Sequence, residues 1–242
     1  MTQLSVNINK IALLRNSRGR HYPDPIGFSK RCLELGAQGI TLHPRPDQRH
    51  ARYDDIFSLR TVCDQYQVEL NVEGYPSDLL IQKVVDAKPD QFTLVPDAPN
   101  QLTSDHGWDF KKNQDLLKKV IDAVQPLGIR VSLFADYNNP DYQVAKEVGA
   151  DRLELYTEPY AETYEKQDSE IVLEGFLNAS KKALDLGLEL NAGHDLNLEN
   201  LQAFIKHIPS IKEVSIGHAL IVECLEMGIE TVIGKYLEAL KG

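Results

Sequence analysis

Short apolar runs alternate with longer amphipathic stretches along the whole chain. The short runs are rich in Val, Ile and Leu and predict β-strands, whereas the longer stretches repeat apolar residues at helical spacing. The predicted strands are Leu4–Asn9, Gly39–His43, Glu69–Glu73, Gln91–Val95, Arg130–Phe134, Arg152–Tyr156, Leu188–Asn191 and Glu213–Ile216. The predicted helices are Pro25–Leu35, Asp54–Tyr66, Ser77–Ala87, Phe110–Val124, Pro140–Val148, Asp168–Leu186, Leu198–His207, His218–Met227 and Ile229–Leu240.

This alternation predicts an α/β fold with a parallel sheet. Eight strand–helix units favour closure into a (β/α)8 TIM barrel, with an open doubly wound sheet as the alternative. Neither GxGxxG nor GxxxxGK[ST] occurs, which excludes the usual dinucleotide and P-loop sites. No linker or shift in composition divides the chain, so we expect a single catalytic domain over residues 1–242.

Composition narrows the class of protein further. The chain is 42% hydrophobic and 26% charged, as in ordinary globular proteins. A net charge of −10 disfavours nucleic acid as a partner. No apolar run approaches the ~20 residues of a membrane helix, and the first residues lack a secretory pattern. Three scattered cysteines without CxxC spacing favour a reducing, cytoplasmic setting.

Reactive side chains follow the predicted strands at their carboxyl ends, which share one mouth in an α/β barrel. The densest example is the segment GITLHPRPDQRH, residues 39–50, whose strand must end near His43 because two prolines follow. This segment supplies His43, Arg45 and His50. Other strand ends and the loops after them supply Asn7, Asn9, Lys10, Glu73, Thr103, Glu154, His194, Gly217 and His218.

These residue types indicate proton transfer between bound anions. Histidine and glutamate exchange protons near neutral pH when burial shifts their pKa values. Gly217 and His218 begin a predicted helix, whose free N–H groups suit phosphate, and barrels commonly bind phosphate after their last two strands. Arg18, Arg45 and His50 could hold a second anionic group. The sequence therefore predicts acid–base chemistry on phosphorylated small molecules.

Each of these residues also has a simpler interpretation. A histidine at a strand end often only packs, and Glu73 could be a hydrogen-bonded, inert carboxylate inside the barrel. The three arginines of residues 15–20 could form a solvated surface. A zinc site is a further alternative, although no HxH or HExxH pair supports it. Its ligands would be His43, His50, His194 and Glu73.

Several blocks together resemble the pyridoxine 5'-phosphate synthase family of vitamin B6 biosynthesis. They run from VNINKIALLRNSRG through GITLHPRPDQRH, NVEGYP, FTLVPD, VSLFAD, LELYTEPYA and LNAGHDLN to SIGHALI, nearly end to end. The resemblance implies a barrel with extra helices and a homo-octamer built from dimers. It also implies condensation of 3-amino-2-oxopropyl phosphate with 1-deoxy-D-xylulose 5-phosphate, giving pyridoxine 5'-phosphate, phosphate and water, with no metal or organic cofactor.

The resemblance also implies a role for individual residues. It makes His43 and Glu73 proton acceptors, His194 a proton donor and Glu154 a group that stabilises the transition state. Positions that bind the aminoketone phosphate match Asn7, Arg18, Gly217 and His218. Positions that bind the deoxyxylulose phosphate match Arg45, His50 and Thr103. These assignments coincide with the strand-end residues selected above.

Three positions depart from the family pattern. Asn9 and Lys10 stand where an Asp-His pair can occur, and Asp195 stands where glycine can occur. Lys10 still offers a donor and Asp195 still offers its backbone N–H, but Asn9 cannot act as a carboxylate. Two alternatives therefore stay open. One is another sugar-phosphate isomerase or aldolase with Lys10 as a Schiff-base lysine, and the other is a non-catalytic binding homologue.

Two predicted loops are longer than simple turns require, over Asn16–Asp24 and Pro96–Asp109. Long ordered loops often close over binding sites. The second loop carries Thr103 and the single tryptophan, Trp108, and we predict that it is a lid that excludes water. In the alternative interpretation the loop is rigid and Trp108 packs against the barrel rim.

Overall fold

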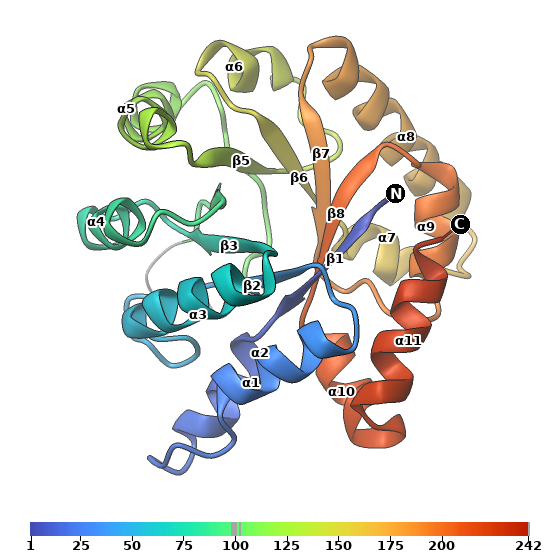
Figure 1. The fold of residues 1–242 in the computed structure, drawn as a ribbon. Coiled ribbons are helices and arrows are strands. Elements are labelled where there is room, and N and C mark those ends of the chain that lie inside the picture. The colour runs from blue at the N-terminus through green and yellow to red at the C-terminus, as the bar shows by residue number, and fades with distance from the viewer. Residues whose placement is uncertain (98–100, 102, 242) are drawn as a thin grey trace.

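The strands form one closed parallel barrel in the order of the chain. The computed structural model describes residues 1–97, 101 and 103–241. Each strand pairs with its sequence neighbours, and β1 pairs with β8 to close the barrel (Figure 1). The strands are β1 Gln3–Asn7, β2 Gly39–Leu42, β3 Glu69–Gly74, β4 Gln91–Leu94, β5 Arg130–Ala135, β6 Arg152–Tyr156, β7 Glu189–Gly193 and β8 Ile211–Ile216. The predicted TIM barrel and all eight strands are confirmed.

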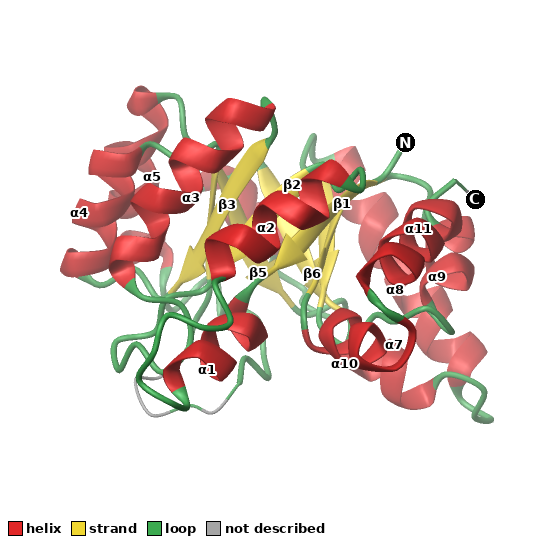
Figure 2. Ribbon diagram, turned by 60° about the horizontal axis from the view of Figure 1, so that its bottom comes forward, coloured by secondary structure: helices red, strands yellow, loops and turns green. Residues whose placement is uncertain are grey.

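Helices surround the barrel and connect successive strands (Figures 1 and 2). They are α1 Asn9–Asn16, α2 Pro25–Glu34, α3 Tyr53–Tyr66, α4 Asp78–Ala87, α5 Gln114–Val124, α6 Tyr142–Glu147, α7 Glu158–Thr163, α8 Ser169–Asp185, α9 Leu201–His207, α10 His218–Met227 and α11 Ile229–Ala239, with a short 3-10 helix η1 Gln125–Leu127. Two helices beyond the predicted set, α1 and α7, follow β1 and β6 directly. With eleven α-helices for eight strands in the described residues, the barrel carries extra helices, as the family resemblance implied.

The first strand is shorter than predicted and ends at Asn7. The side-chain oxygen of Asn7 accepts the backbone N–H of Asn9 at 3.0 Å, which turns the chain directly into α1. Asparagine commonly makes such local turns, which compete with an extended backbone. The predicted strand Leu4–Asn9 is therefore wrong at its end, and Asn9 and Lys10 begin a helix.

Arg15 departs from the alternative interpretation of a solvated surface, whereas Arg18 and Arg20 are exposed as that interpretation expects. Its guanidinium forms a buried, two-pronged ion pair with Asp55, with N–O distances of 2.7 and 2.9 Å. The neighbouring Asn16 donates to the backbone carbonyls of Gln48, Arg49 and His50 at 3.1, 3.0 and 2.7 Å. These contacts fix the loop after β2 to the end of α1.

Side chains of the strands alternate between two environments. Apolar residues such as Leu4, Val6 and Ile40 are fully buried and pack between the strands and the helices. Their neighbours Ser5 and Thr41 face the barrel interior, where their hydroxyl oxygens lie 2.6 Å apart. The hydrophobic core is therefore a shell around the strands, and the interior of the barrel is polar.

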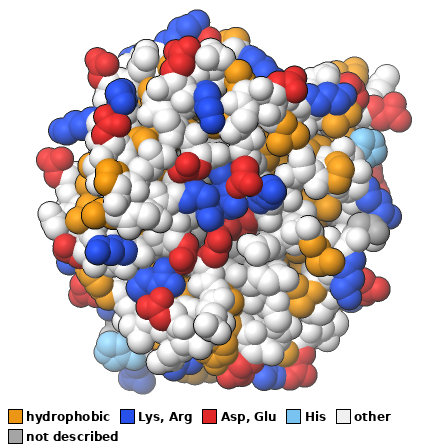
Figure 3. Space-filling model, turned by 45° about the horizontal axis from the view of Figure 1, so that its top comes forward, with side chains coloured by type: hydrophobic (Ala, Val, Ile, Leu, Met, Phe, Trp, Pro, Cys, Tyr) orange, Lys and Arg blue, Asp and Glu red, His pale blue; other side chains and the backbone are white. Residues whose placement is uncertain are grey.

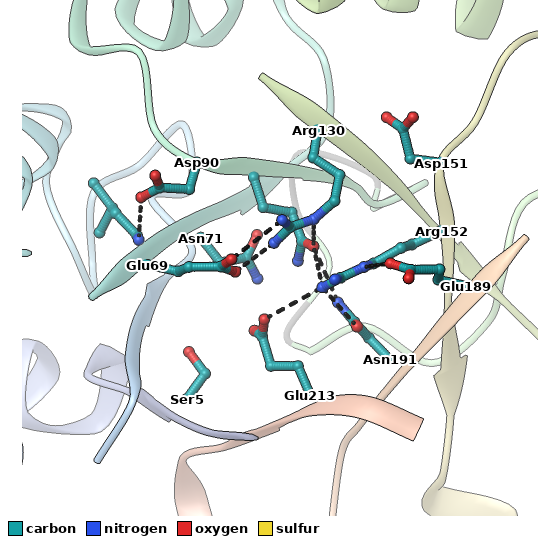
Figure 4. A network of polar contacts seen from close by, with 12 residues as sticks. Ser5, Glu69, Asn71, Asp90, Arg130, Asp151, Arg152, Glu189, Asn191 and Glu213 are labelled. Atoms are coloured by element: carbon teal, nitrogen blue, oxygen red, sulfur yellow. Dashed lines mark hydrogen bonds and ion pairs between the residues drawn. The ribbon is translucent and has the colours of Figure 1, made fainter. Parts of the chain in front are cut away.

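Two arginines, which begin β5 and β6, lie at the amino-terminal end of this polar interior (Figure 4). Arg130 pairs with Glu69 and donates to Gln91 at 2.9 Å. Arg152 lies 2.9 Å from Glu189 through Nε and also contacts Gln91, Asn191 and Glu213 through Nη1. In the space-filling view, basic and acidic side chains gather together near the middle of the molecule (Figure 3). Opposite charges and amides thus satisfy one another where most barrels carry aliphatic layers.

The loop after β4 is only partly described. Residues 98–100 and 102, within the predicted lid Pro96–Asp109, lie outside the described residues. Trp108 is 2% exposed, and its indole N–H donates to the carbonyl of Leu94 at 2.8 Å. Gly107 donates to Asp136 at 3.0 Å. Trp108 therefore packs against the barrel rim, as the alternative interpretation predicted for this residue.

Candidate active site

A cavity of about 510 Å³ opens at the carboxyl ends of the strands. Almost all residues selected from the sequence line it, although they come from distant parts of the chain. They are Asn7, Asn9, Lys10, His43, Arg45, His50, Glu73, Thr103, Glu154, His194, Asp195, Gly217 and His218. The exception is Arg18, which is exposed and does not line this cavity.

Glu73 projects from β3 into the buried floor of the cavity. Its carboxylate oxygens accept hydrogen bonds from Ser215 at 3.3 Å and from Asn7 and Asn71 at 3.4 Å. Burial raises the pKa of Glu73 to about 8, and the hydrogen bond from Ser215 opposes this increase. Glu73 can therefore both bind and release a proton close to neutral pH.

His43 follows β2 and lies between two carboxylates. Its Nδ1 is 3.9 Å from Glu73, and its Nε2 is 3.8 Å from Asp97. Burial lowers the pKa of His43 well below its usual value, and the positive charge of Arg45 adds to this effect. The imidazole is therefore neutral at neutral pH and is ready to accept a proton.

Asn9 holds the backbone of His43 from both sides. The Asn9 oxygen accepts the N–H of His43 at 3.0 Å, and the Asn9 amide donates to the carbonyl of His43 at 3.2 Å. A carboxylate could accept the first of these hydrogen bonds but could not donate the second. The departure at Asn9 therefore provides a contact that aspartate lacks.

Glu154 projects from β6 and is 2% exposed. Burial raises the pKa of Glu154 well above its usual value, and repulsion from Glu73 and Glu213 adds to this effect. Its Oε2 atom is buried and has no hydrogen-bond partner among the described residues. An unpaired buried oxygen costs free energy, so such an atom at the cavity wall is available to a ligand.

Gly193 leaves the space that the Glu154 carboxyl occupies. A Cβ atom at position 193 would lie 2.6 Å from Oε1 of Glu154. We expect Gly193→Ala to displace this carboxyl group and lower kcat by roughly 10- to 100-fold, since small misplacements of catalytic groups cost rates of this order. Steady-state kinetics and circular dichroism would measure turnover and folding.

The matched control for this substitution is Gly234→Ala. A Cβ at position 234 would meet nothing within 4 Å, so we expect both kcat and stability to be retained. A Gly193→Ala variant with wild-type kcat would show that the position of Glu154 does not matter for turnover.

His194 follows β7 in an unusual backbone conformation. His194 and Asp195 have φ angles of 81° and 58°, a region that few non-glycine residues adopt. Thr157 stabilises this turn by donating to the carbonyls of Gly193 and His194. The His194 ring packs edge-on against Phe134 at 5.1 Å, and burial lowers its pKa. The turn thereby directs the imidazole into the cavity, while Asp195 is exposed at its edge.

Basic groups gather on the opposite wall. Arg45 is 6% exposed and pairs with Asp97 at 2.7 Å. Burial lowers the pKa of His50 to about 4, and Lys10 adds to this effect. The Nδ1 atom of His50 is buried without a hydrogen-bond partner among the described residues. Arg45, Lys10 and Thr103 could hold an anion here, with His50 as a neutral partner.

The junction of β8 and α10 offers a second group of hydrogen-bond donors. Gly217 directly precedes α10, so backbone N–H groups at the helix start are available to a ligand. A Cβ at position 217 would lie 3.1 Å from Cβ of Asn7 and 3.2 Å from its carbonyl oxygen. Glycine at this position therefore permits the close approach of β1 to the helix start.

Three further residues belong to this region and were not selected from the sequence. Ser215 hydrogen-bonds to Glu73, Arg49 lines the cavity, and Asp97 pairs with Arg45 behind it. Asp97 could have been found, because a carboxylate directly follows the fourth strand in the segment FTLVPD. Ser215 carries no comparable signal, since serine is common at strand ends.

Other functional classes receive no support from the geometry. Among residues 1–97, 101 and 103–241, no three His, Cys, Asp or Glu side chains are arranged to hold a metal ion. Lys10 lies in the first turn of α1 and not on a barrel strand, where the aldolase alternative would place its Schiff-base lysine. The same described residues contain no helix long and apolar enough to cross a membrane.

The fold is that of an α/β-barrel enzyme, and its cavity brings histidine and glutamate side chains together with basic residues and the start of a helix. The family described as "Pyridoxal phosphate biosynthesis protein PdxJ" matches residues 4–242. The chain belongs to this family.

Individual relatives agree with this assignment. A pyridoxine 5'-phosphate synthase from Parabacteroides distasonis is 49% identical over 236 residues and covers 98% of both chains. Another from Bacteroides fragilis is 49% identical over 241 residues and covers 100% of both. Among solved structures, tryptophan synthase from M. tuberculosis superposes with a TM-score of 0.68 at 10% identity, covering 100% of this chain and 93% of the other. This last similarity concerns the fold alone.

Proposed function

We propose that the cavity condenses 3-amino-2-oxopropyl phosphate with 1-deoxy-D-xylulose 5-phosphate to give pyridoxine 5'-phosphate, phosphate and water. The observation that carries this proposal is one cavity lined by Glu73, His43, His194 and Glu154 together with basic residues and the start of α10. The named relatives have the same activity in their names and match the chain over its whole length. The reaction requires two phosphorylated substrates, which suits this arrangement.

The two substrates occupy opposite sides of the cavity in this proposal. The aminoketone phosphate lies against Asn7, Gly217 and His218, at the start of α10. The deoxyxylulose phosphate lies against Arg45, His50 and Thr103, with Lys10 and Asp195 at the edge of the cavity. Arg18 is proposed as an aminoketone-phosphate ligand by family resemblance only, because it is exposed and lies outside the described cavity.

The chemistry begins when the amine of the aminoketone adds to the carbonyl of the deoxyxylulose phosphate. Glu73 and His43 accept protons from the amine and pass one to the departing hydroxyl group, so that water leaves and an imine-type adduct forms. Enolisation then allows the phosphate of the sugar to leave, and a carbon–carbon bond closes the ring. His194 donates a proton to the last departing water. Glu154 stabilises the developing charge through its unpaired oxygen.

The assembly and location of the protein follow from the same family. We propose a homo-octamer built from dimers, acting in the cytoplasm. Exposed apolar side chains such as Ile171 and Leu225, which are 74% and 79% exposed, offer surface that such an assembly could cover. Light scattering on the purified protein would give a mass near eight chains if this proposal is right.

Turnover by the purified protein tests the reaction. Both substrates are supplied, and pyridoxine 5'-phosphate and released phosphate are measured together. Equal amounts of the two products support the proposed condensation. Binding of either substrate without product would instead indicate a non-catalytic homologue.

The pH dependence of turnover tests the role of Glu73. A proton acceptor must be unprotonated, and burial raises the pKa of Glu73 to about 8. We therefore expect kcat/KM to rise as pH increases from about 6.5 to 8 and then to level off. Well below pH 8 the increase should approach tenfold for each pH unit. The hydrogen bond from Ser215 lowers the pKa of Glu73, so Ser215→Ala should move this rise to higher pH. A flat profile in both proteins would exclude Glu73 as the acceptor.

A further inference from the structure

Asp97 lies behind the cavity wall and contacts three residues that line it. Its Oδ2 atom is 2.7 Å from Nη1 of Arg45 and 3.8 Å from Nε2 of His43, and it accepts the hydroxyl of Ser104 at 2.8 Å. Arg45, His43 and Ser104 all line the cavity, whereas Asp97 does not. The side chain of Asp97 is 4% exposed. One buried carboxylate therefore joins the segment after β2 to the segment after β4.

We propose that Asp97 is a positioning residue for the side of the cavity that binds the deoxyxylulose phosphate. This inference rests on the proposed function and adds a residue that touches neither substrate. The ion pair with Asp97 holds the side chain of Arg45 in place. The hydrogen bond from Ser104 to the same carboxylate holds the segment that carries the adjacent Thr103. An anion that contacts both Arg45 and Thr103 then meets groups that are already in place.

The geometry of Arg45 favours this role. Asp97 and the carbonyl of Gln101, at 3.3 Å, both contact Nη1 of the guanidinium. Nε and Nη2, at the other edge of the group, form no hydrogen bond with the described residues, and in this proposal they bind the phosphate in the cavity. A planar guanidinium can bind a carboxylate on one side and a phosphate on another without changing its position.

The second oxygen of Asp97 argues against a purely structural ion pair. Its Oδ1 atom is buried and has no hydrogen-bond partner in the described part of the chain. Buried ion pairs stabilise a fold only when their remaining oxygens are also satisfied, as they are in the pair of Arg15 with Asp55. The carboxylate of Asp97 is not fully hydrogen-bonded in this way. An unsatisfied buried carboxylate oxygen is typical of a functional residue.

The test is the effect of Asp97→Ala on each substrate separately. Loss of a charge-assisted hydrogen bond to Arg45 should raise KM for 1-deoxy-D-xylulose 5-phosphate by roughly 10- to 100-fold. KM for 3-amino-2-oxopropyl phosphate should change by less than about twofold, because the described residues that Asp97 contacts, His43, Arg45 and Ser104, do not lie at the start of α10. Asp97→Glu keeps the charge and should recover part of the loss, whereas Asp97→Asn should recover less.

Ser104→Ala is the matched variant. It removes the link to the loop and leaves the pair of Asp97 with Arg45 intact, so we expect a smaller rise in the same KM. Because Ser104 acts through Asp97, the double variant should be no worse than Asp97→Ala alone. Additive effects would show that the two residues act independently and would overturn the proposal.

Two other outcomes would also overturn it. An equal rise in both KM values would indicate a general structural role. A fall in KM for the deoxyxylulose phosphate would show that Asp97 only competes with phosphate for Arg45.

Calorimetric binding of 1-deoxy-D-xylulose 5-phosphate to the wild type and to Asp97→Ala requires no turnover. The wild type could bind this compound more tightly than Asp97→Ala does and still form no product. In that case the proposed function fails and the positioning role stands.

Discussion

Replacement of Glu73 by glutamine is expected to lower kcat by about two to four powers of ten. Glutamine preserves the shape of the side chain and can still contact Ser215 and Asn7, but it cannot accept a proton at neutral pH. Substrate binding should be retained, because the anion-binding positions lie on other segments. The loss should therefore appear in kcat and kcat/KM alike, measured as formation of pyridoxine 5'-phosphate.

Destabilisation of the fold should not explain the lower kcat of Glu73→Gln. Burial raises the pKa of Glu73, so the native state holds a proton that the unfolded chain releases at lower pH. Stability contributed by this proton is complete below about pH 4.5 and declines as pH rises through about 8. Glu73→Gln should thus unfold no more easily than the wild type at pH 8.

The control for the kinetic effect is Glu162→Gln. The side chain of Glu162 is 68% exposed, so this substitution should leave kcat unchanged. Wild-type turnover by Glu73→Gln would refute the assigned role.

Replacement of Arg152 by methionine is expected to lower the free energy of unfolding by about 3–5 kcal/mol. Arg152 pairs with Glu189 and lies 3.8 Å from Glu213, which is 3% exposed. Methionine would remove one of the two cations that act on Glu213, the other being Arg130, and would leave the side-chain oxygen of Asn191 without the hydrogen bond from Arg152. Unfolding in urea at pH 7, followed by circular dichroism at fixed protein concentration, would measure the effect.

Lys118→Met provides the comparison on the surface. Lys118 pairs with Asp122 one helical turn away, and the two side chains are 57% and 60% exposed. Exposed pairs of this kind contribute about 0.3–0.5 kcal/mol. If Arg152→Met destabilised the protein no more than Lys118→Met, the polar interior would not contribute to stability through this ion pair.

The fold could be predicted from the sequence because its pattern is local and repeated. Each strand brings apolar residues to its outer face and is followed by an amphipathic helix, so strand number, order and direction follow from periodicity. The end of the first strand could not be predicted in this way. It depends on the side chain of Asn7, whose turn with Asn9 outweighs the extended pattern of the residues around it.

The candidate site could be predicted as far as its residues lie at strand ends. His43 and Glu73 end their predicted strands and Glu154 lies within the sixth, so the topology of a barrel brings them together without further information. Partnerships between distant segments were not predictable. The pairing of Arg15 with Asp55 and of Arg45 with Asp97 depends on how loops fold over the barrel rim, and a solvated arginine and a buried one look the same in a sequence.

The contacts of Asn16 have a consequence for cooperation between the two substrates. Its amide joins the end of α1 to the backbone of residues 48–50, so these segments form one mechanical unit. Asn9 and Lys10 belong to this unit at the other end of the same helix. A ligand that orders His50 is therefore expected to order α1 as well, which follows directly on Asn7. We expect part of the entropy cost of ordering one half of the cavity to be met when the other half is occupied, so that the first substrate tightens binding of the second in a calorimetric titration.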